Sequence, residues 1–194
     1  MTKAKRPAAT DPPERRRALT AAAASWVLQH GLAALSLRPL AKALGTSDRM
    51  LVYHFGSKQG LIEAVVAEAA QRLESALAAA ERVDGVAPYL HAVWQALARP
   101  ERRALSLFFL ELHLLAGRHG EPYAGAAQAV VAAWRQRLVA RLRRGGHSPK
   151  RAAETAELLL AAVDGALLLG MVEPGSPAAA AGLARLVAFA EAPS

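Results

Sequence analysis

The side chains best suited to chemistry with a ligand lie in residues 48–53, where acidic, basic, sulfur-containing and aromatic groups follow one another. Arg49 is the one group here able to hold a guanine edge with two hydrogen bonds, a contact worth about 1–3 kcal/mol of discrimination between bases. Met50 can contact the methyl group of a thymine. Asp48 is better suited to support the positive N-terminus of a helix than to read a base. Contact with nucleobase edges is the chemistry that these side chains could do if a helix presents them on one exposed face.

Positive charge is concentrated at the same end of the chain. Residues 1–60 hold ten Lys and Arg against three Asp and Glu, a net charge of +7, whereas residues 61–194 hold 14 against 13. Such a local field attracts a polyanion, because each phosphate that is neutralised releases condensed counterions. Residues 1–13 combine basic side chains with three prolines and no periodicity, which predicts a disordered basic arm.

The other reactive side chains form no recognised catalytic or metal-binding pattern. The 194 residues include no cysteine, which excludes disulfides, thiolate metal sites and cysteine catalysis. No two of the six histidines are four residues apart, and the Gly-x-Ser-x-Gly and Gly-x-Gly-x-x-Gly motifs do not occur. We therefore expect no enzyme, no metal and no cofactor. The alternative is a helical-bundle enzyme or small-molecule carrier without specific DNA binding.

Neither a membrane segment nor a secretory signal is expected. A transmembrane helix needs about 20 consecutive apolar residues, and the nearest candidate, residues 158–172, carries Asp164 in its middle. Residues 1–17 have no apolar core behind their charges. These patterns predict a cytoplasmic protein.

Helical spacing of apolar residues recurs along the chain, and no stretch shows the alternation typical of a strand. Capping residues, glycines and prolines divide the pattern into nine expected helices, at residues 14–30, 37–44, 48–54, 58–82, 89–98, 101–116, 123–144, 149–172 and 177–190. Helix 101–116 is apolar nearly all round, which predicts a central helix buried by its neighbours. The fold class is all-α.

The two short helices within residues 36–55 have the geometry of a helix-turn-helix. The small Ala41 allows the helices to approach, Gly45 permits the turn, and Leu51 fills the crossing from the second helix. Ser36 is expected to cap the first helix, and Thr46 or Ser47 the second. An ordinary helical hairpin is the alternative interpretation. The surrounding positive charge favours the DNA-binding one.

The segment from Leu35 to Leu61 resembles the DNA-binding domain of TetR-type (tetracycline-repressor-like) transcriptional regulators. The resemblance rests on Leu35-Ser-Leu-Arg-Pro-Leu-Ala-Lys-Ala-Leu-Gly-Thr-Ser47, followed by Leu51-Val-Tyr-His-Phe-Gly-Ser-Lys-Gln-Gly-Leu61, and it extends over about residues 15–66. One departure is Val52, where the family usually carries an aromatic side chain that contacts phosphate. Tyr53 is assigned that contact here.

The resemblance implies an N-terminal three-helix helix-turn-helix domain, residues 14–60, whose third helix enters the major groove of double-stranded DNA. Phosphate contacts position such a domain, and base contacts specify the sequence. The expected DNA-binding residues are Ser36, Arg38, Thr46, Ser47, Arg49, Met50, Tyr53, His54 and Lys58.

Residues 61–194 are expected to form a helical bundle for ligand binding and dimerisation. Aromatic, imidazole and carboxylate groups on successive helices suggest a site for an unidentified small molecule, namely His91, Trp94, Phe108, Phe109, His113, Trp134 and Asp164. Packing in an ordinary core is the alternative for each of them. Asp164 lies between two triplets of leucine, so its carboxylate needs a partner such as a helix terminus, an arginine, a dimer mate or a ligand cation.

The last two expected helices interleave small residues with leucines, which suggests a homodimer held by a four-helix bundle. A two-fold dimer requires a near-palindromic operator. The resemblance implies a repressor that a small-molecule effector releases from this operator. A second basic run, residues 135–151, has seven Lys and Arg and no acid, and is interpreted as a solvated face.

Overall fold

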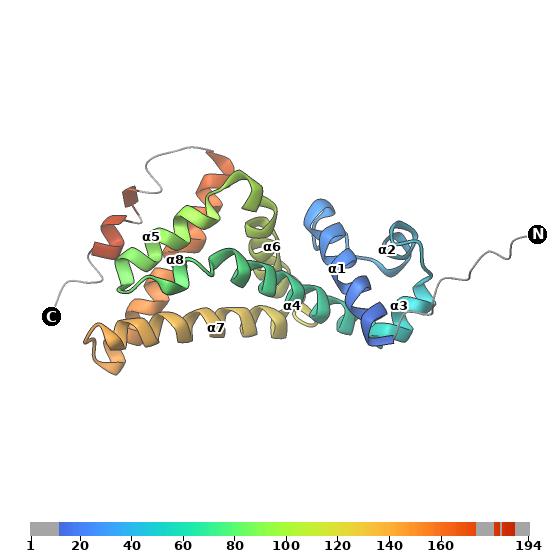
Figure 1. Cartoon of the computed structure of the whole chain (residues 1–194), viewed down its shortest axis with the longest axis horizontal. Helices are drawn as coiled ribbons and strands as arrows, with labels where there is room; N and C mark the ends of the chain where they lie inside the picture. Colours follow the sequence, from blue (N-terminus) through green and yellow to red (C-terminus); the bar gives the residue numbers. More distant parts are fainter. Residues whose placement is uncertain (1–11, 174–180, 183, 189–194) are drawn as a thin grey trace, which may run out of the picture. The chain divides into compact units, whose positions relative to one another are not determined.

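The computed structural model describes residues 12–173, 181–182 and 184–188, and all regular secondary structure among these residues is helical (Figure 1). The chain forms two compact units, Met1–Glu68 and Ala69–Ser194. The division falls inside helix α4 (Lys58–Leu77), which therefore contributes residues to both units. The predicted all-α fold class is confirmed.

The first unit contains α1 (Pro12–His30), α2 (Leu37–Ala43), α3 (Asp48–Phe55) and the start of α4. Its buried side chains are Leu19, Ala23, Val27, Leu40, Leu51, Phe55, Leu61, Ile62 and Val65, among others. Helix α1 begins two residues before the expected start, because proline suits a first helical turn, whose N–H groups have no partner within the helix. Residues 1–11 of the predicted basic arm lie outside the described residues.

The turn between α2 and α3 has the expected helix-turn-helix features. Gly45 adopts a φ of +61°, in the left-handed region that favours glycine. The Thr46 N–H donates to the carbonyl oxygen of Ala41 over 2.9 Å. Ala41 and Leu51 are both buried, so the spacing that predicted the helix crossing is confirmed.

The predicted cap at Ser47 forms, whereas the predicted side-chain cap at Ser36 was wrong. The Ser47 hydroxyl accepts a hydrogen bond from the Met50 N–H, and the Ser148 hydroxyl accepts one from the Arg151 N–H. Ser36 occupies the N-cap position of α2, but its side chain makes no capping hydrogen bond. The third residue of α2 is Pro39, which has no N–H to donate, so the usual partner of a cap is missing there.

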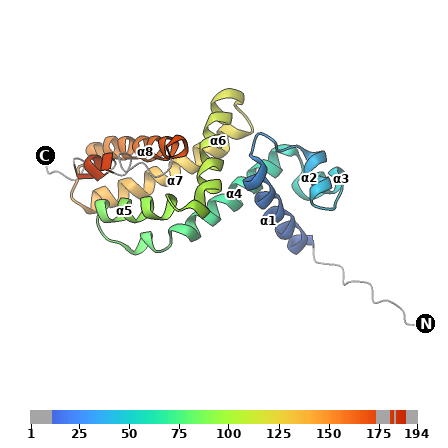
Figure 2. The same ribbon diagram turned by 90° about the horizontal axis from the view of Figure 1, so that it is seen from above.

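The second unit contains the rest of α4 and the helices that follow it in the chain. They are η1 (Ala80–Arg82), α5 (Val86–Leu97), η2 (Pro100–Arg102), α6 (Arg103–His119), α7 (Tyr123–Arg144) and α8 (Pro149–Val172). Helix α7 packs against both α6 and α8 (Figure 2). The bounds of α7 and α8 are those that the sequence predicts.

The predicted continuous helix 58–82 was wrong, because α4 ends at Leu77 and a separate 3-10 turn follows. The guanidinium of Arg141 in α7 donates to the carbonyl oxygens of Val83 (2.7 Å) and Glu81 (3.0 Å). It also pairs with the Glu81 carboxylate at 3.0 Å. Carbonyls at this end of the segment thus bond to Arg141, which favours a tight turn over a further helical turn.

The interpretation of residues 135–151 as a solvated face was wrong for Arg141. Its side chain is buried, and the guanidinium lies over the Tyr89 ring at 3.8 Å from the ring centroid. The Tyr89 hydroxyl donates to the Glu81 carboxylate over 3.1 Å. Arg141 therefore joins α7 to α5 and η1 in the second unit.

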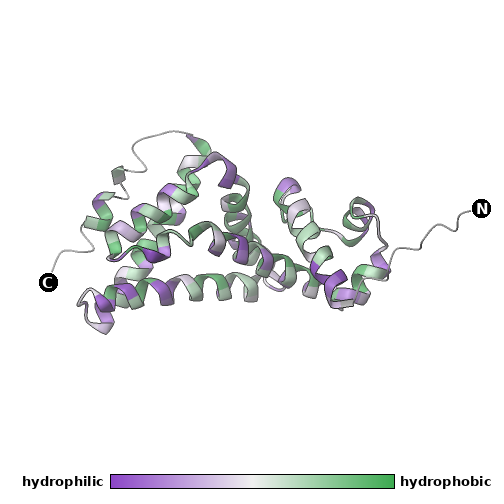
Figure 3. Cartoon of the chain, viewed as in Figure 1, coloured by the Kyte–Doolittle hydropathy of each residue, from purple (hydrophilic) through white to green (hydrophobic). Residues whose placement is uncertain are grey.

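The prediction that helix 101–116 is buried all round was also wrong. Helix α6 is hydrophobic along most of its length (Figure 3), but Leu107 is 43% exposed and Leu114 is 71% exposed. Leu105, Phe108 and Leu112 on the opposite side are buried. Helix α5 differs as well, since it begins at Val86, three residues earlier than expected.

Helix α8 is the one described helix long and apolar enough to cross a membrane by length and composition, with a mean hydropathy of 1.8 over 18 residues. One side of α8 packs along α7, and only 17% of this apolar window is buried within the single chain. Of the predicted last helix, 177–190, residues 181–182 and 184–188 are helical. Its other positions lie outside the described residues.

Candidate nucleic-acid interface and ligand cavity

Helix α3 has one face in the core of the first unit and one face in solvent. Leu51 and Phe55 are buried, whereas Met50 is 41% exposed and Tyr53 is 72% exposed. Arg49 lies on the exposed side as well. The Asp48 carboxylate accepts a hydrogen bond from the Arg49 N–H over 3.0 Å, which supports the positive end of the helix. The exposed face thus offers a guanidinium, a thioether and a phenol.

The other predicted DNA-binding residues lie in the same unit. Ser36, Arg38, Ser47 and Lys58 are exposed, and Thr46 and His54 are half-buried. The His54 ring meets the Tyr53 ring edge-on, with centroids 5.1 Å apart. Lys58 is the first residue of α4, where the Ser57 hydroxyl accepts a hydrogen bond from the Gly60 N–H. A cation at a helix N-terminus suits a phosphate.

Arg16 is a functional candidate that the sequence did not single out. Its Nε atom donates to the carbonyl oxygen of His54 over 3.0 Å, and its guanidinium lies over the Phe55 ring at 5.6 Å from the centroid. These contacts tie α1 to the last turn of α3. Arg16 is the middle one of three consecutive arginines, and the sequence alone does not show which of the three contacts α3.

Gly60 marks a close approach that the sequence also left unnoticed. A Cβ atom at this position would lie 2.2 Å from the carbonyl oxygen of Phe55, a backbone atom at the end of α3. Only glycine allows α4 to begin this close to α3. The turn at Gly56, with a φ of +77°, lies between these two residues.

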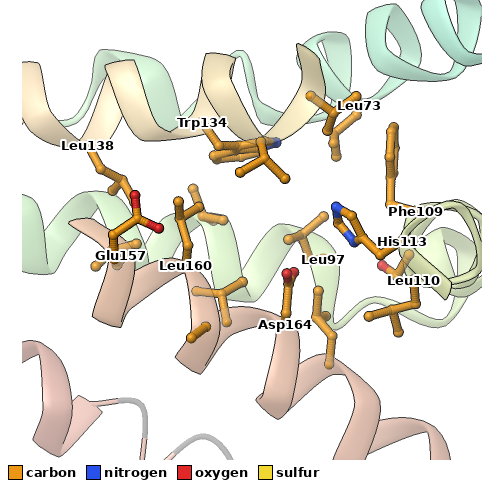
Figure 4. Close-up of a pocket in the computed structure, with 18 residues that line it drawn as sticks. Leu73, Leu97, Phe109, Leu110, His113, Trp134, Leu138, Glu157, Leu160 and Asp164 are labelled. Atoms are coloured by element: carbon orange, nitrogen blue, oxygen red, sulfur yellow. The ribbon is translucent and has the colours of Figure 1, made fainter. Parts of the chain in front are cut away.

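A cavity of about 260 Å³ lies within the second unit, walled by α4, α5, α6, α7 and α8. Its wall is mostly apolar, with Leu73, Leu90, Val93, Leu97, Leu110, Val131, Leu138 and Leu160 among its residues. Such a volume and lining are typical of a small-molecule site. Figure 4 shows Trp134, Phe109, His113 and Asp164 around this space.

Four of the seven predicted ligand-binding residues line this cavity, namely Phe109, His113, Trp134 and Asp164. His91 and Trp94 line a separate hollow between α5 and the C-terminal residues Ala184 and Val187. Phe108 is buried and meets Phe109 edge-on, with centroids 5.2 Å apart.

Two polar wall residues, Ser106 and Glu157, were not predicted. Both occur among apolar helical residues without a motif to mark them.

The polar groups of the cavity differ in whether they have hydrogen-bond or ionic partners. The Ser106 Oγ and His113 Nε2 atoms are buried, and neither has a hydrogen-bond partner among the described residues. Burial raises the pKa of the Asp164 carboxyl, and nearby His113 lowers it again in part. The Glu157 carboxylate is hydrogen-bonded to the Arg135 guanidinium, and this contact lowers the pKa of Glu157. The cavity therefore has one neutralised carboxylate and one that lacks such a partner.

Two family models match the chain. The model of bacterial regulatory proteins of the tetR family matches residues 19–65, and the C-terminal domain model of LmrA/YxaF-like transcriptional regulators matches residues 83–176. The first match contains α2, α3 and the turn between them, and the second contains most of the cavity wall. The sequence has no significant match among curated proteins.

Solved structures with the same fold include several regulators. A TetR-family regulator from Rhodococcus sp. superposes with a TM-score of 0.76 at 24% identity, over 93% of this chain and 100% of that one. A TetR-family regulator from Cytophaga hutchinsonii gives a TM-score of 0.78 at 18% identity, over 96% and 100%. BioQ bound to its natural double-stranded DNA operator gives 0.61 at 23% identity, over 91% and 97%.

Proposed function

Because this chain belongs to the TetR family of DNA-binding transcriptional regulators, we propose that it is a cytoplasmic repressor released from its operator by a small molecule in the cavity of its second unit. Regulators of this family bind double-stranded DNA as dimers. The observation that carries the proposal is the two-sided α3 helix, with Leu51 and Phe55 buried and Arg49, Met50 and Tyr53 in solvent.

In the proposed complex α3 lies in the major groove. Arg49 holds a guanine edge and Met50 packs on a thymine methyl group. Phosphates are held by side chains at the start of α2, in the turn, in the second half of α3 and at the start of α4, namely Ser36, Arg38, Thr46, Ser47, Tyr53, His54 and Lys58. The Ser47 hydroxyl accepts a hydrogen bond from the Met50 N–H and keeps its own proton for a phosphate oxygen.

The proposed dimer forms through α8 and the C-terminal segment that follows it. Leu158, Leu168, Leu169 and Val172 of α8 are 44–75% exposed in the single chain. An apolar surface of this kind marks an interaction site in soluble proteins. A two-fold axis through this surface gives two α3 helices and hence a near-palindromic operator.

The proposed release mechanism is a population shift between two states of the dimer. A ligand that binds one state more tightly moves the equilibrium by that difference in affinity alone. Helix α4 contributes to both units and Leu73 of α4 lines the cavity, so α4 is the proposed coupling element.

A binding role suits the cavity better than hydrolysis does, although serine, histidine and aspartate all line it. A nucleophilic serine needs a hydrogen bond to its general base. Within the part of the chain that the structure describes, the Ser106 Oγ and His113 Nε2 atoms each lack a hydrogen-bond partner. These two groups are therefore not arranged as a nucleophile and its base.

Selection of bound sequences from a random duplex pool tests the proposal most directly. We expect enrichment of one near-palindromic sequence, with affinity that falls steeply as salt rises. A pool that shows no enrichment at modest ionic strength would contradict the proposal.

A further inference from the structure

The charges around the cavity of the second unit are unbalanced. Two carboxylates, Glu157 and Asp164, line the cavity, and its described wall includes no lysine or arginine. Glu157 is neutralised by Arg135. Among the described residues, Asp164 forms no ion pair within 4.0 Å. One negative charge at the cavity is thus left without a cationic partner from the described chain.

The groups around Asp164 are hydrogen-bond acceptors and aromatic faces. In Figure 4 the Asp164 carboxylate points into the cavity, with His113, Phe109 and Trp134 around the same space. The buried Nε2 atom of His113 has no hydrogen-bond partner in residues 12–173, 181–182 and 184–188. A neutral imidazole can accept a hydrogen bond at that nitrogen, and a carboxylate accepts at both oxygens. A donor bound between them would satisfy both.

The aromatic side chains add an attraction for positive charge. The guanidinium of Arg137 already lies over the Trp134 ring, at 5.6 Å from its centroid. The Trp134 side chain also lines the cavity, as does Phe109. Ring faces attract cations within about 6 Å, and more strongly where water is excluded.

Ser106 gives the cavity a second polar position. It is 4% exposed and lies seven residues before His113 on α6, and no described residue forms a hydrogen bond with its Oγ atom. Seven residues of helix correspond to about 10 Å. A buried hydroxyl without a partner costs free energy until a ligand or water supplies one.

We infer that this cavity binds an organic cation, with an ammonium group held between Asp164 and His113 and an apolar body against Trp134, Phe109 and the leucines. This inference rests on the proposed function, in which the cavity is the effector site. An anion would be repelled by the Asp164 carboxylate, which has no cationic side chain of the described chain beside it. A neutral molecule of the same shape would leave the charge of Asp164 unpaired, which is costly in a partly apolar site.

Three probes of one shape and different charge test this inference, namely phenylbutylamine, phenylbutanol and phenylbutyrate. Their binding to the full chain without DNA is measured by calorimetry near neutral pH, where the amine is protonated. We expect the amine to bind about ten times more tightly than the alcohol, because hydrogen bonds between charged groups are roughly twice as strong as those between neutral groups. The carboxylate is expected to bind most weakly.

Two variants of α8, each of which removes one negative charge, test whether the preference for the amine depends on Asp164. Asp164→Asn should remove the preference for the amine over the alcohol. Glu154→Gln should keep it, because Glu154 lies on the same helix but does not line the cavity. Thermal unfolding of both variants shows that the fold is retained.

The inference is overturned if the alcohol binds as tightly as the amine, if Asp164→Asn keeps the preference, or if none of the probes binds. Release of the selected operator is measured separately. If the amine binds in a way that depends on Asp164 but does not release the operator, the result supports the cation site and contradicts the proposed repressor mechanism. If the alcohol releases the operator as readily as the amine does, the result supports the repressor mechanism and contradicts the cation site.

Discussion

The Nε atom of Arg16, in the second turn of α1, donates a hydrogen bond to the carbonyl oxygen of His54, in the last turn of α3. The last carbonyl groups of a helix have no partner within it, and a cation near them is favourable. Arg16 thus satisfies one such group while its guanidinium covers the Phe55 ring. Through these two contacts α1 positions the helix that we propose reads DNA.

We expect Arg16→Ala to lower the free energy of unfolding by about 1 kcal/mol, the usual contribution of such a hydrogen bond. Operator affinity should fall further than in Arg17→Ala, which removes the same charge from a neighbouring exposed residue. Thermal unfolding and fluorescence anisotropy measure the two effects. Equal losses of affinity in both variants would mean that Arg16 acts through its charge and not by positioning α3.

Much of the fold was predictable because local signals mark its boundaries. The bounds of α7 and α8 follow from Gly145 and from the Ser148-Pro149 pair, which stop one helix and start the next. The end of α4 was not predictable, since no glycine or proline stands there. The group that bonds to the carbonyls beyond it is Arg141, about 60 residues away in the sequence.

The cavity was predictable only in part, for a reason of helical register. Leu90, Val93 and Leu97 of α5 line it, and Trp94 lies one residue, or about 100° of helical turn, from Val93. That rotation places His91 and Trp94 at another hollow. Composition identifies aromatic groups on α5, but the packing of α5 decides which cavity they face.

The proposed division between base and phosphate contacts predicts different outcomes for Arg49→Ala and Lys58→Ala. Arg49→Ala should cost about 1–3 kcal/mol on the operator and much less on random DNA. Lys58→Ala should weaken both alike and reduce the slope of log affinity against log salt by about 1. Anisotropy titrations at several salt concentrations measure both. Identical losses on operator and random DNA for both variants would refute the division.

The close approach at Gly60 predicts opposite effects for two glycine substitutions in helices. Gly60→Ala should destabilise the chain by roughly 1–3 kcal/mol, because the new Cβ would displace the backbone of Phe55. Gly117→Ala is the matched control. It lies within α6 with no atom within 4 Å of the added Cβ, so it should stabilise by about 0.5–1 kcal/mol. Denaturant unfolding measures both, and a neutral Gly60→Ala would contradict the close packing of α3 on α4.

The two carboxylates of the cavity predict opposite pH effects on stability. The pKa of Asp164 is raised by burial, so its ionisation opposes folding once the pH rises above the ordinary value of 3.8. Asp164→Asn should therefore raise the melting temperature near neutral pH, and the gain should disappear as the pH falls through the raised pKa toward 3.8. The interaction with nearby His113 lowers the pKa of Asp164 in part and so limits this gain.

Glu157 provides the contrast, because its hydrogen bond with Arg135 lowers its pKa. Its ionised form favours folding above the ordinary value of 4.5, and this contribution is lost as the pH falls through the lowered pKa. Glu157→Gln should therefore lower the melting temperature slightly near neutral pH and have no effect in acid. Calorimetric melting curves across the acid range test both signs, and a shift of the same sign in both variants would contradict the assignment.

The exposed apolar face of α8 predicts where the dimer can be broken. Leu168→Glu and Leu169→Glu place charges on side chains that are 53% and 60% exposed in the single chain, so they should leave the fold intact and separate the protomers. Size-exclusion chromatography with light scattering should then give the monomer mass of 20.4 kDa. Operator affinity should collapse, because each protomer contacts one half-site.

Leu114→Glu, on the exposed side of α6, is the control and should remain dimeric. Dissociation by Leu114→Glu with an intact dimer in both α8 variants would place the interface on α6.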